Sequence, residues 1–159
     1  ARKAALPAGL IAQLHLTYED GREETILTDE TWGTREGQIR FSEIYDGETF
    51  DARVEAGDVS PAVYFEGRTD QLIPQQGEEI REQERVKAAR IFTTPKGEVV
   101  VDFGQEVTGY LEFCVDAREG DVVEISHAEV MDKEGSFYTE NYRSAKAKIH
   151  YTCRDGVQT

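Results

Sequence analysis

The sequence has few of the residues that usually build a metal site or a disulfide framework. It contains only two cysteines, three histidines and one tryptophan among 159 residues. Cys114 and Cys153 lack the spacing of metal ligands, and the sequence leaves open whether they pair or stay as free thiols. Apolar runs fall well short of the ~20 residues that span a bilayer, and no signal peptide is visible. The sequence therefore predicts no membrane partner and leaves the compartment open.

Positive charge is scarce as well. The 18 Lys and Arg residues are outnumbered by 32 Asp and Glu residues, which gives a formal net charge of -14. A surface this acidic repels phosphate backbones, so nucleic acid is not an expected partner. Hydrophobic residues make up 38% of the chain and occur in short segments, a pattern more typical of β-structure than of a helical bundle. The length suffices for one domain with a sizeable core or for two small ones.

Familiar catalytic motifs are also missing. The sequence has no Gly-rich phosphate loop, no His/Cys metal cluster and no Gly-x-Ser-x-Gly motif. His15, His127 and His150 fall in three separate predicted strands. His127 shares a strand face with Glu129, but a partly buried sheet histidine explains this better than a proton-transfer pair. We therefore assign no catalytic residue and no metal ligand.

Alternating apolar and polar residues predict a series of β-strands. Residues 9–18 alternate cleanly, and Asp20-Gly21 then predicts a tight turn into a returning strand at 23–28. A domain boundary is predicted near Asp70, within a polar, Gly- and Pro-containing stretch. Asp155-Gly156 predicts a last hairpin turn whose second strand the sequence does not reach. Further strands are predicted at 38–45, 61–65, 99–101, 110–116, 122–130 and 147–153.

The stretch around Gly104 interrupts the most apolar of these strands. Three valines at 99–101 predict a strand buried on both faces, and Asp102-Phe103-Gly104-Gln105 ends it. Gly104 permits a backbone conformation or a close approach that a side chain would forbid. We interpret this stretch as a bulge or corner in which Asp102 and Gln105 hydrogen-bond to the local backbone.

Residues 78–92 give a conflicting signal. They are rich in strong helix formers and carry Glu/Lys/Arg pairs at i, i+4. Their apolar residues form neither a continuous helical stripe nor a strand alternation. Propensity alone predicts a helix here.

Residues 45–53 form a carboxylate-rich stretch with two aromatic side chains. Carboxylates at this spacing could bind calcium, but the stretch lacks the EF-hand pattern. A solvated turn with an ion pair from Arg53 to Asp51 or Glu48 is the preferred interpretation. Aromatic faces that stack on sugar C–H groups, next to carboxylates that accept hydroxyl hydrogen bonds, also make this the best sugar-contact candidate. The residues of this candidate site are Tyr45, Asp46, Glu48, Phe50 and Asp51.

Several motifs resemble one enzyme family. Residues 101–110, VDFGQEVTGY, resemble the DFGQN…GW signature of the β-sandwich that precedes the catalytic barrel in bacterial α-L-rhamnosidases, glycoside hydrolase family 78. Glu106 and Tyr110 depart from the usual Asn and Trp. Similar matches occur at 17–21, 28–32, 44–53 (YDGE-x-YDAR), 128–135 (AEVL-x-x-x-G), 138–146 (YTENLRSA) and Tyr151. The motif residues taken as structural are Asp102, Gly104, Gln105, Gly109, Glu129, Asn141 and Arg143.

The resemblance implies an all-β fold of antiparallel, jelly-roll-like β-sandwiches. Residues 1–70 would be the C-terminal part of the family's N-terminal module, and residues 71–159 the module before the barrel. It also implies an extended strand at 78–92 in place of the helix, and we adopt that prediction. The implied function is that of a non-catalytic scaffold and possible sugar-contact surface for an enzyme that removes terminal rhamnose.

The resemblance further implies what lies outside this sequence. The front of the N-terminal module and the whole (α/α)₆ barrel, which holds the family's general acid and base, would be absent. The expected partners are that barrel and a rhamnose-containing carbohydrate. No cofactor is expected, although calcium is possible by family analogy and its ligands map to no residue here. The competing hypothesis is a free-standing carbohydrate-binding or adhesion module.

Overall fold

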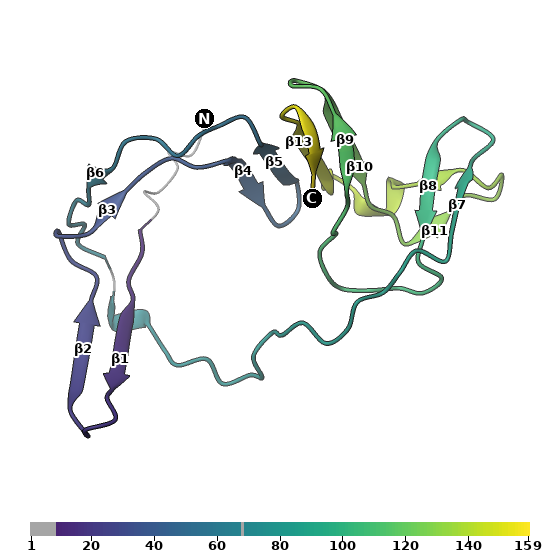
Figure 1. The fold of residues 1–159 in the computed structure, drawn as a ribbon. Helices are drawn as coiled ribbons and strands as arrows, with labels where there is room; N and C mark the ends of the chain where they lie inside the picture. Colours follow the sequence, from purple (N-terminus) through teal and green to yellow (C-terminus); the bar gives the residue numbers. More distant parts are fainter. Residues whose placement is uncertain (1–8, 68) are drawn as a thin grey trace, which may run out of the picture. The chain divides into compact units, whose positions relative to one another are not determined.

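The structure is a computed structural model that describes residues 9–67 and 69–159, and these residues form an all-β fold (Figure 1). They contain no α-helix, which confirms the predicted fold class. Two short 3-10 turns are present, η1 (Thr69–Gln71) and η2 (Glu140–Tyr142). The strands are β1 (Gln13–Thr17), β2 (Glu23–Leu27), β3 (Gly33–Thr34), β4 (Ile39–Glu43), β5 (Gly47–Asp51), β6 (Ser60–Pro61), β7 (Arg90–Thr93), β8 (Val99–Asp102), β9 (Val115–Ala117), β10 (Val122–Ser126), β11 (Val130–Met131), β12 (Phe137–Tyr138), β13 (Lys148–Thr152) and β14 (Gly156–Gln158).

The chain divides into two compact units that interleave in sequence. Unit 1 contains the described residues up to Glu36 together with Ala56–Gly77. Unit 2 contains Gly37–Glu55 and Glu78–Thr159. The predicted domain division at residue 70 stays a prediction. The structure adds that residues 37–55 pack with the C-terminal part of the chain.

Unit 1 is built on the predicted β1–β2 hairpin. The two strands pair antiparallel, from Gln13 opposite Leu27 to Thr17 opposite Glu23. The Asp20-Gly21 turn closes as expected. The short strands β3 and β6 form a second antiparallel pair in this unit.

Unit 2 contains a four-stranded sheet in the order β10-β13-β5-β4. β10 pairs antiparallel with β13, and β4 pairs antiparallel with β5. Between them, β5 runs parallel to β13, the one parallel pair among the described strands. The pairs β7–β8, β11–β12 and β9–β14 are antiparallel, as predicted for most of the fold.

A small aromatic core lies on one face of this sheet. The rings of Phe50 and Tyr151 stack with centroids 5.1 Å apart, and Phe113 meets Tyr151 edge-on at 5.3 Å. Cys153 is fully buried at the end of β13, whereas Cys114 is exposed. Both cysteines are free thiols, which settles the alternative that the sequence left open.

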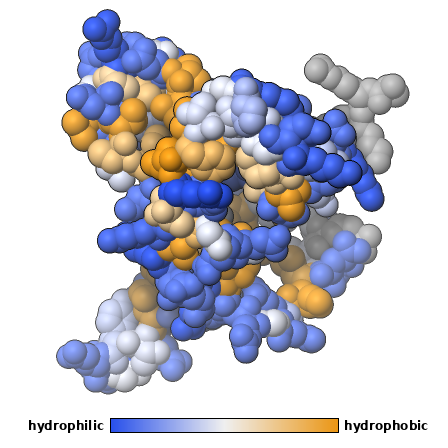
Figure 2. Space-filling view, turned by 90° about the vertical axis from the view of Figure 1, so that its right-hand side faces the viewer, coloured by the Kyte–Doolittle hydropathy of each residue, from blue (hydrophilic) through white to orange (hydrophobic). Residues whose placement is uncertain are grey.

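Large apolar side chains also remain at the surface of each unit, among hydrophilic ones (Figure 2). In unit 1 they include Val63 and Ile73, and in unit 2 they include Ile44 and Val99. The packed interior of either unit is therefore small.

The helix predicted by propensity at residues 78–92 is wrong. This segment is extended without regular structure until β7 begins at Arg90, so the strand that the resemblance implies is realised only at its end. Arg85 pairs with Glu82 within the segment and with the distant Glu112, and the Tyr110 hydroxyl donates to Glu82. Because the segment has no apolar stripe to bury, helix propensity alone does not stabilise a helix here.

Two predictions about the C-terminal part need correction. The Asp155-Gly156 turn does lead to a second strand, β14, which pairs with β9. The strand predicted at 110–116 shrinks to β9, because only Val115–Ala117 finds that partner. Pairing with a strand distant in sequence, which local pattern cannot reveal, decides both outcomes.

Candidate functional site

The predicted sugar-contact residues lie in a strand rather than in a solvated turn. Residues 47–51 form β5, and Tyr45 and Asp46 form the tight connection from β4. Because successive side chains of a strand point to opposite faces, Glu48 and Phe50 share one face of the sheet. Thr49 and Asp51 share the other. The structure therefore divides the candidate set between two faces.

Three members of the set already have partners within the chain. The ring of Phe50 is stacked on Tyr151. The carboxylate of Asp51 accepts two hydrogen bonds from the Arg53 guanidinium, at 2.9 and 2.8 Å, which is the pairing preferred from sequence. Those bonds lower the pKa of Asp51 to about 2. Asp46 forms a salt bridge of 3.2 Å with Lys146.

Glu48 lines an open hollow in unit 2. The hollow has a volume of about 470 Å³ and lies where the β4–β5 hairpin meets the start of β13. Aliphatic side chains and polar groups alternate around it, which suits a ligand with both C–H and hydroxyl groups. Its lining residues are Ser42, Glu43, Ile44, Gly47, Glu48, His127, Ala147 and Ile149.

The register of the sheet explains how Glu48 reaches this hollow. Glu48 lies opposite Ser42 on β4 and opposite Ile149 on β13, so these three side chains form a row across three strands. Glu43 accepts hydrogen bonds from the backbone N–H groups of Tyr45 and Asp46, at 2.8 and 2.9 Å, and so fixes the hairpin turn.

Two polar side chains in the hollow are available to a ligand. Within the part of the chain that the structure describes, the side chains of Glu48 and His127 form no hydrogen bond or ion pair with another residue. His127 follows β10, and its backbone N–H donates to the carbonyl of Ala147 at 3.3 Å. An acceptor-only carboxylate and an imidazole that can donate or accept therefore face the same space. The sequence pattern indicates Glu48 but gives no link between it and His127.

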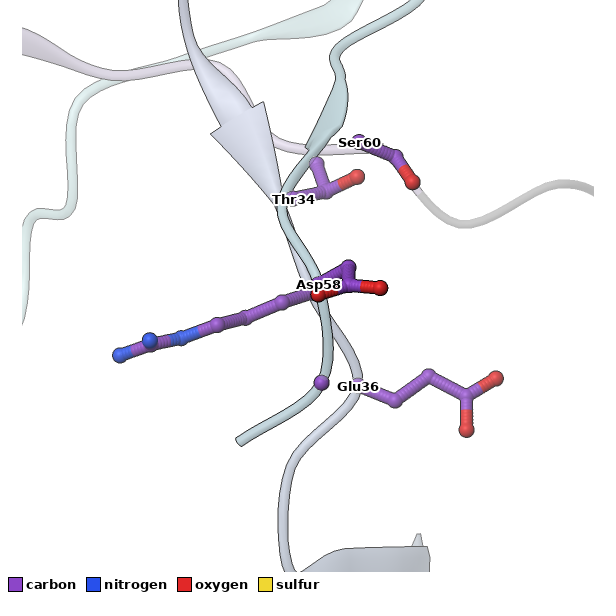
Figure 3. Close-up of a pocket in the computed structure, with 6 residues that line it drawn as sticks. Thr34, Glu36, Asp58 and Ser60 are labelled. Atoms are coloured by element: carbon purple, nitrogen blue, oxygen red, sulfur yellow. The ribbon is translucent and has the colours of Figure 1, made fainter. Parts of the chain in front are cut away.

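A second hollow lies in unit 1, between β3 and β6 (Figure 3). It has a volume of about 420 Å³, and the side chains of Thr34, Asp58 and Glu36 point to the same side of the strand pair. Its lining has no aromatic or branched aliphatic side chain that could pack on an apolar group. The sequence gives no signal for these residues, because Thr34 and Ser60 lie in two-residue strands and the others lie in the irregular segments beside them.

The described residues contain no group of three or more His, Cys, Asp or Glu side chains that could hold a metal ion. They also contain no helix long and apolar enough to cross a membrane.

The motif residues at the end of β8 form a structured corner. Gly104 has a φ of +75°, and its N–H donates to the Asp102 carboxylate at 2.7 Å. Asp102 also pairs with Arg90 at 2.8 Å. The bond from Gly104 and the pairing with Arg90 lower the pKa of Asp102. Asp102 therefore bonds to the local backbone at this corner, while Gln105 and Gly109 lie in the irregular segment that follows.

The remaining motif residues connect two segments of unit 2. The side-chain amide of Asn141, in η2, donates to the Glu129 carboxylate at 3.5 Å. Arg143 follows η2 with a φ of 58°, in the left-handed region that few residues other than glycine adopt. Glu129 and Asn141, which come from two separate motifs, are therefore in contact near β11.

Comparison with known proteins shows two family matches along the chain. Residues 3–84 match the family model of the α-L-rhamnosidase N-terminal domain, and residues 92–159 match that of the bacterial α-L-rhamnosidase concanavalin-like domain. The chain belongs to the α-L-rhamnosidase family. The order and coverage of the two matches confirm the resemblance seen in the motifs.

Individual members of the α-L-rhamnosidase family show the same similarity. An α-L-rhamnosidase of Streptomyces avermitilis is 33% identical over 158 residues, which cover 91% of this chain and 15% of that protein. The crystal structure of native α-L-rhamnosidase from Aspergillus terreus superposes with a TM-score of 0.76 at 31% identity, covering 93% of this chain and 18% of that one. The S. avermitilis enzyme complexed with L-rhamnose gives 0.74 at 31% identity, over 94% and 16%. The chain thus spans less than a fifth of these relatives.

Proposed function

We propose that this chain is a non-catalytic β-sandwich region of an α-L-rhamnosidase-type glycoside hydrolase, and that it supports a catalytic barrel carried elsewhere in the same protein. The observation that carries the proposal is the match of both family domains, in family order, along the chain. The expected substrate of the whole enzyme is a glycan or glycoside with terminal rhamnose.

The same region contributes a weak sugar-contact surface at the Glu48 hollow. Ile149 and Ala147 offer aliphatic surface to the C–H face of a sugar ring. Glu48 accepts hydrogen bonds from hydroxyl groups, and His127 both donates and accepts them. Of the five residues predicted from sequence, Glu48 is therefore the one best placed for this role.

Titration of the chain with L-rhamnose, with and without calcium, tests the sugar contact. Calorimetry should give a dissociation constant no tighter than about 1 mM, equivalent to roughly −4 kcal/mol, because the hollow is open to solvent. The variant E48A should weaken binding further, whereas D58A in the unit 1 hollow should leave it unchanged. Calcium-dependent micromolar binding, lost in D51A, would instead favour a free-standing carbohydrate-binding module. If calorimetry detects no binding heat at tens of millimolar sugar, the sugar-contact proposal is wrong and only the scaffold role stands.

A further inference from the structure

Strand β5 belongs to one family domain by sequence and to the other by hydrogen bonding. It lies within residues 3–84, the match to the N-terminal domain, while its partner β13 lies within residues 92–159, the match to the concanavalin-like domain. We propose that the hairpin of residues 37–55 is a strap that completes the concanavalin-like domain, so that this domain folds only with a segment supplied by the N-terminal one. The proposal does not depend on what the chain binds.

The backbone bonds along β13 are the first support. The register runs in parallel from Gly47 opposite Lys148 to Asp51 opposite Thr152. Bonds at both ends extend the pairing: the N–H of Ala147 donates to the Tyr45 carbonyl, and that of Ala52 donates to the Thr152 carbonyl, each at 2.9 Å. Without the strap, one whole edge of β13 would present unpaired backbone groups.

Side chains reinforce this attachment. Phe50 stacks on Tyr151 at an interplanar angle of 3°, and Tyr151 also receives the edge of Phe113. Phe50 therefore provides one ring of the three-ring core described above. A domain cut at the boundary between the two family matches would lose that ring.

Gly47 is the position where the strap comes closest to β13. Its φ is +99°, and a Cβ atom placed there would lie 1.9 Å from the carbonyl oxygen of Lys148. Real Cβ atoms essentially never come this close to backbone, so any other residue would force the two strands apart. Gly47 thus offers a single substitution that detaches the strap.

Amide hydrogen exchange on the full chain tests whether residues 37–55 are required for the stability of β10 and β13 or only pair at their edge. We expect G47V to accelerate exchange at residues 122–126 and 148–152 by roughly tenfold or more, because β10 and β13 lose their support. The matched control is G97V, since Gly97 has a similar φ of +87° in the β7–β8 turn but no atom within 4 Å. G97V should change exchange in β10 and β13 by less than about twofold. Acceleration confined to residues 37–55 in G47V would overturn the proposal.

A second measurement decides the question if G47V fails to fold. Protease recognition sequences are inserted in the wild-type chain before Gly37 and after Glu55, where the chain is exposed. After cleavage at both sites, the 37–55 peptide should co-elute with residues 56–159 in native size-exclusion chromatography and separate in denaturant. If the peptide separates in native buffer while β10 and β13 keep their exchange protection, the strap is not required.

Discussion

At the scale of single residues, the corner at Gly104 gives the clearest stability prediction. We expect G104V to lower the free energy of unfolding by ~1–3 kcal/mol, because a valine at a φ of +75° is strained. Its Cβ would also contact the Ala89 Cβ at 3.4 Å. Chemical denaturation gives the value. The control G77V, with no positive φ and no atom within 4 Å, should change stability by less than about 0.5 kcal/mol. An unchanged midpoint in G104V would show that the corner tolerates a side chain.

The Asp51–Arg53 pair predicts a specific dependence of stability on pH. Hydrogen bonds from Arg53 lower the pKa of Asp51 from 3.8 to about 2 in the folded chain. Because the pKa of Asp51 is lower in the folded state than in the unfolded state, its carboxylate stabilises the fold at pH values above the unfolded-state pKa. That stabilisation is lost as the pH falls through the folded-state pKa. The stability difference between wild type and D51N should therefore be constant above about pH 5 and decline as the pH falls from about 5 to 2.

Equilibrium unfolding of both proteins across this pH range measures the effect. R53Q removes the guanidinium donor and should reduce the effect of D51N in the same window, leaving the smaller part that comes from the backbone N–H of residue 53. A wild-type advantage that persists unchanged below pH 2 would exclude Asp51 as its source.

At the scale of elements, sequence predicted those strands whose pattern is local. The alternation in residues 9–18 and 23–28 became β1 and β2 because one hairpin supplies both the pattern and the partner. Strand β5 was interpreted as a turn, because a glycine and carboxylates dominate its sequence. It is paired on both edges, with the neighbouring β4 and with β13, whose residues lie about a hundred positions away, and no local signal encodes the second pairing.

The two faces of the β4–β5 hairpin should respond differently to truncation. F50A removes the ring stacked on Tyr151 and should cost ~1–3 kcal/mol, less than a fully buried Phe→Ala substitution because Phe50 is only half-buried. Phe41 lies on the opposite face and is 47% exposed, so F41A should cost clearly less. Thermal or urea unfolding compares the two variants. Equal losses would show that the aromatic core does not hold the hairpin.

At the scale of the whole molecule, the candidate site was only partly predictable. Glu48 was identified because carboxylates and aromatics cluster around it in sequence. Its neighbours His127 and Ile149 come from segments that only the folded sheet brings to the hollow. The family, in contrast, was evident from motifs such as residues 101–110, which can be read from a short stretch of sequence without the fold.

Catalysis is also a property of the whole molecule. We expect the chain alone to release no measurable product from an aryl α-L-rhamnoside, because no acid/base pair is assigned to its residues. A chromogenic assay with a catalytically complete relative as positive control makes the measurement. Turnover above the buffer rate that disappears when an acidic residue of this chain is replaced would contradict the scaffold proposal.

The parallel contact of β5 with β13 also has a consequence during synthesis. Gly47 leaves the ribosome about a hundred residues before its partner Lys148. At elongation rates of ~5–20 residues per second, the strap waits roughly 5–20 s with one edge unpaired. Loop closure over that span also makes the pairing a late and slow event in folding. During this interval β4 can cover one edge of β5, while the edge that later pairs with β13 is open to pairing with another molecule.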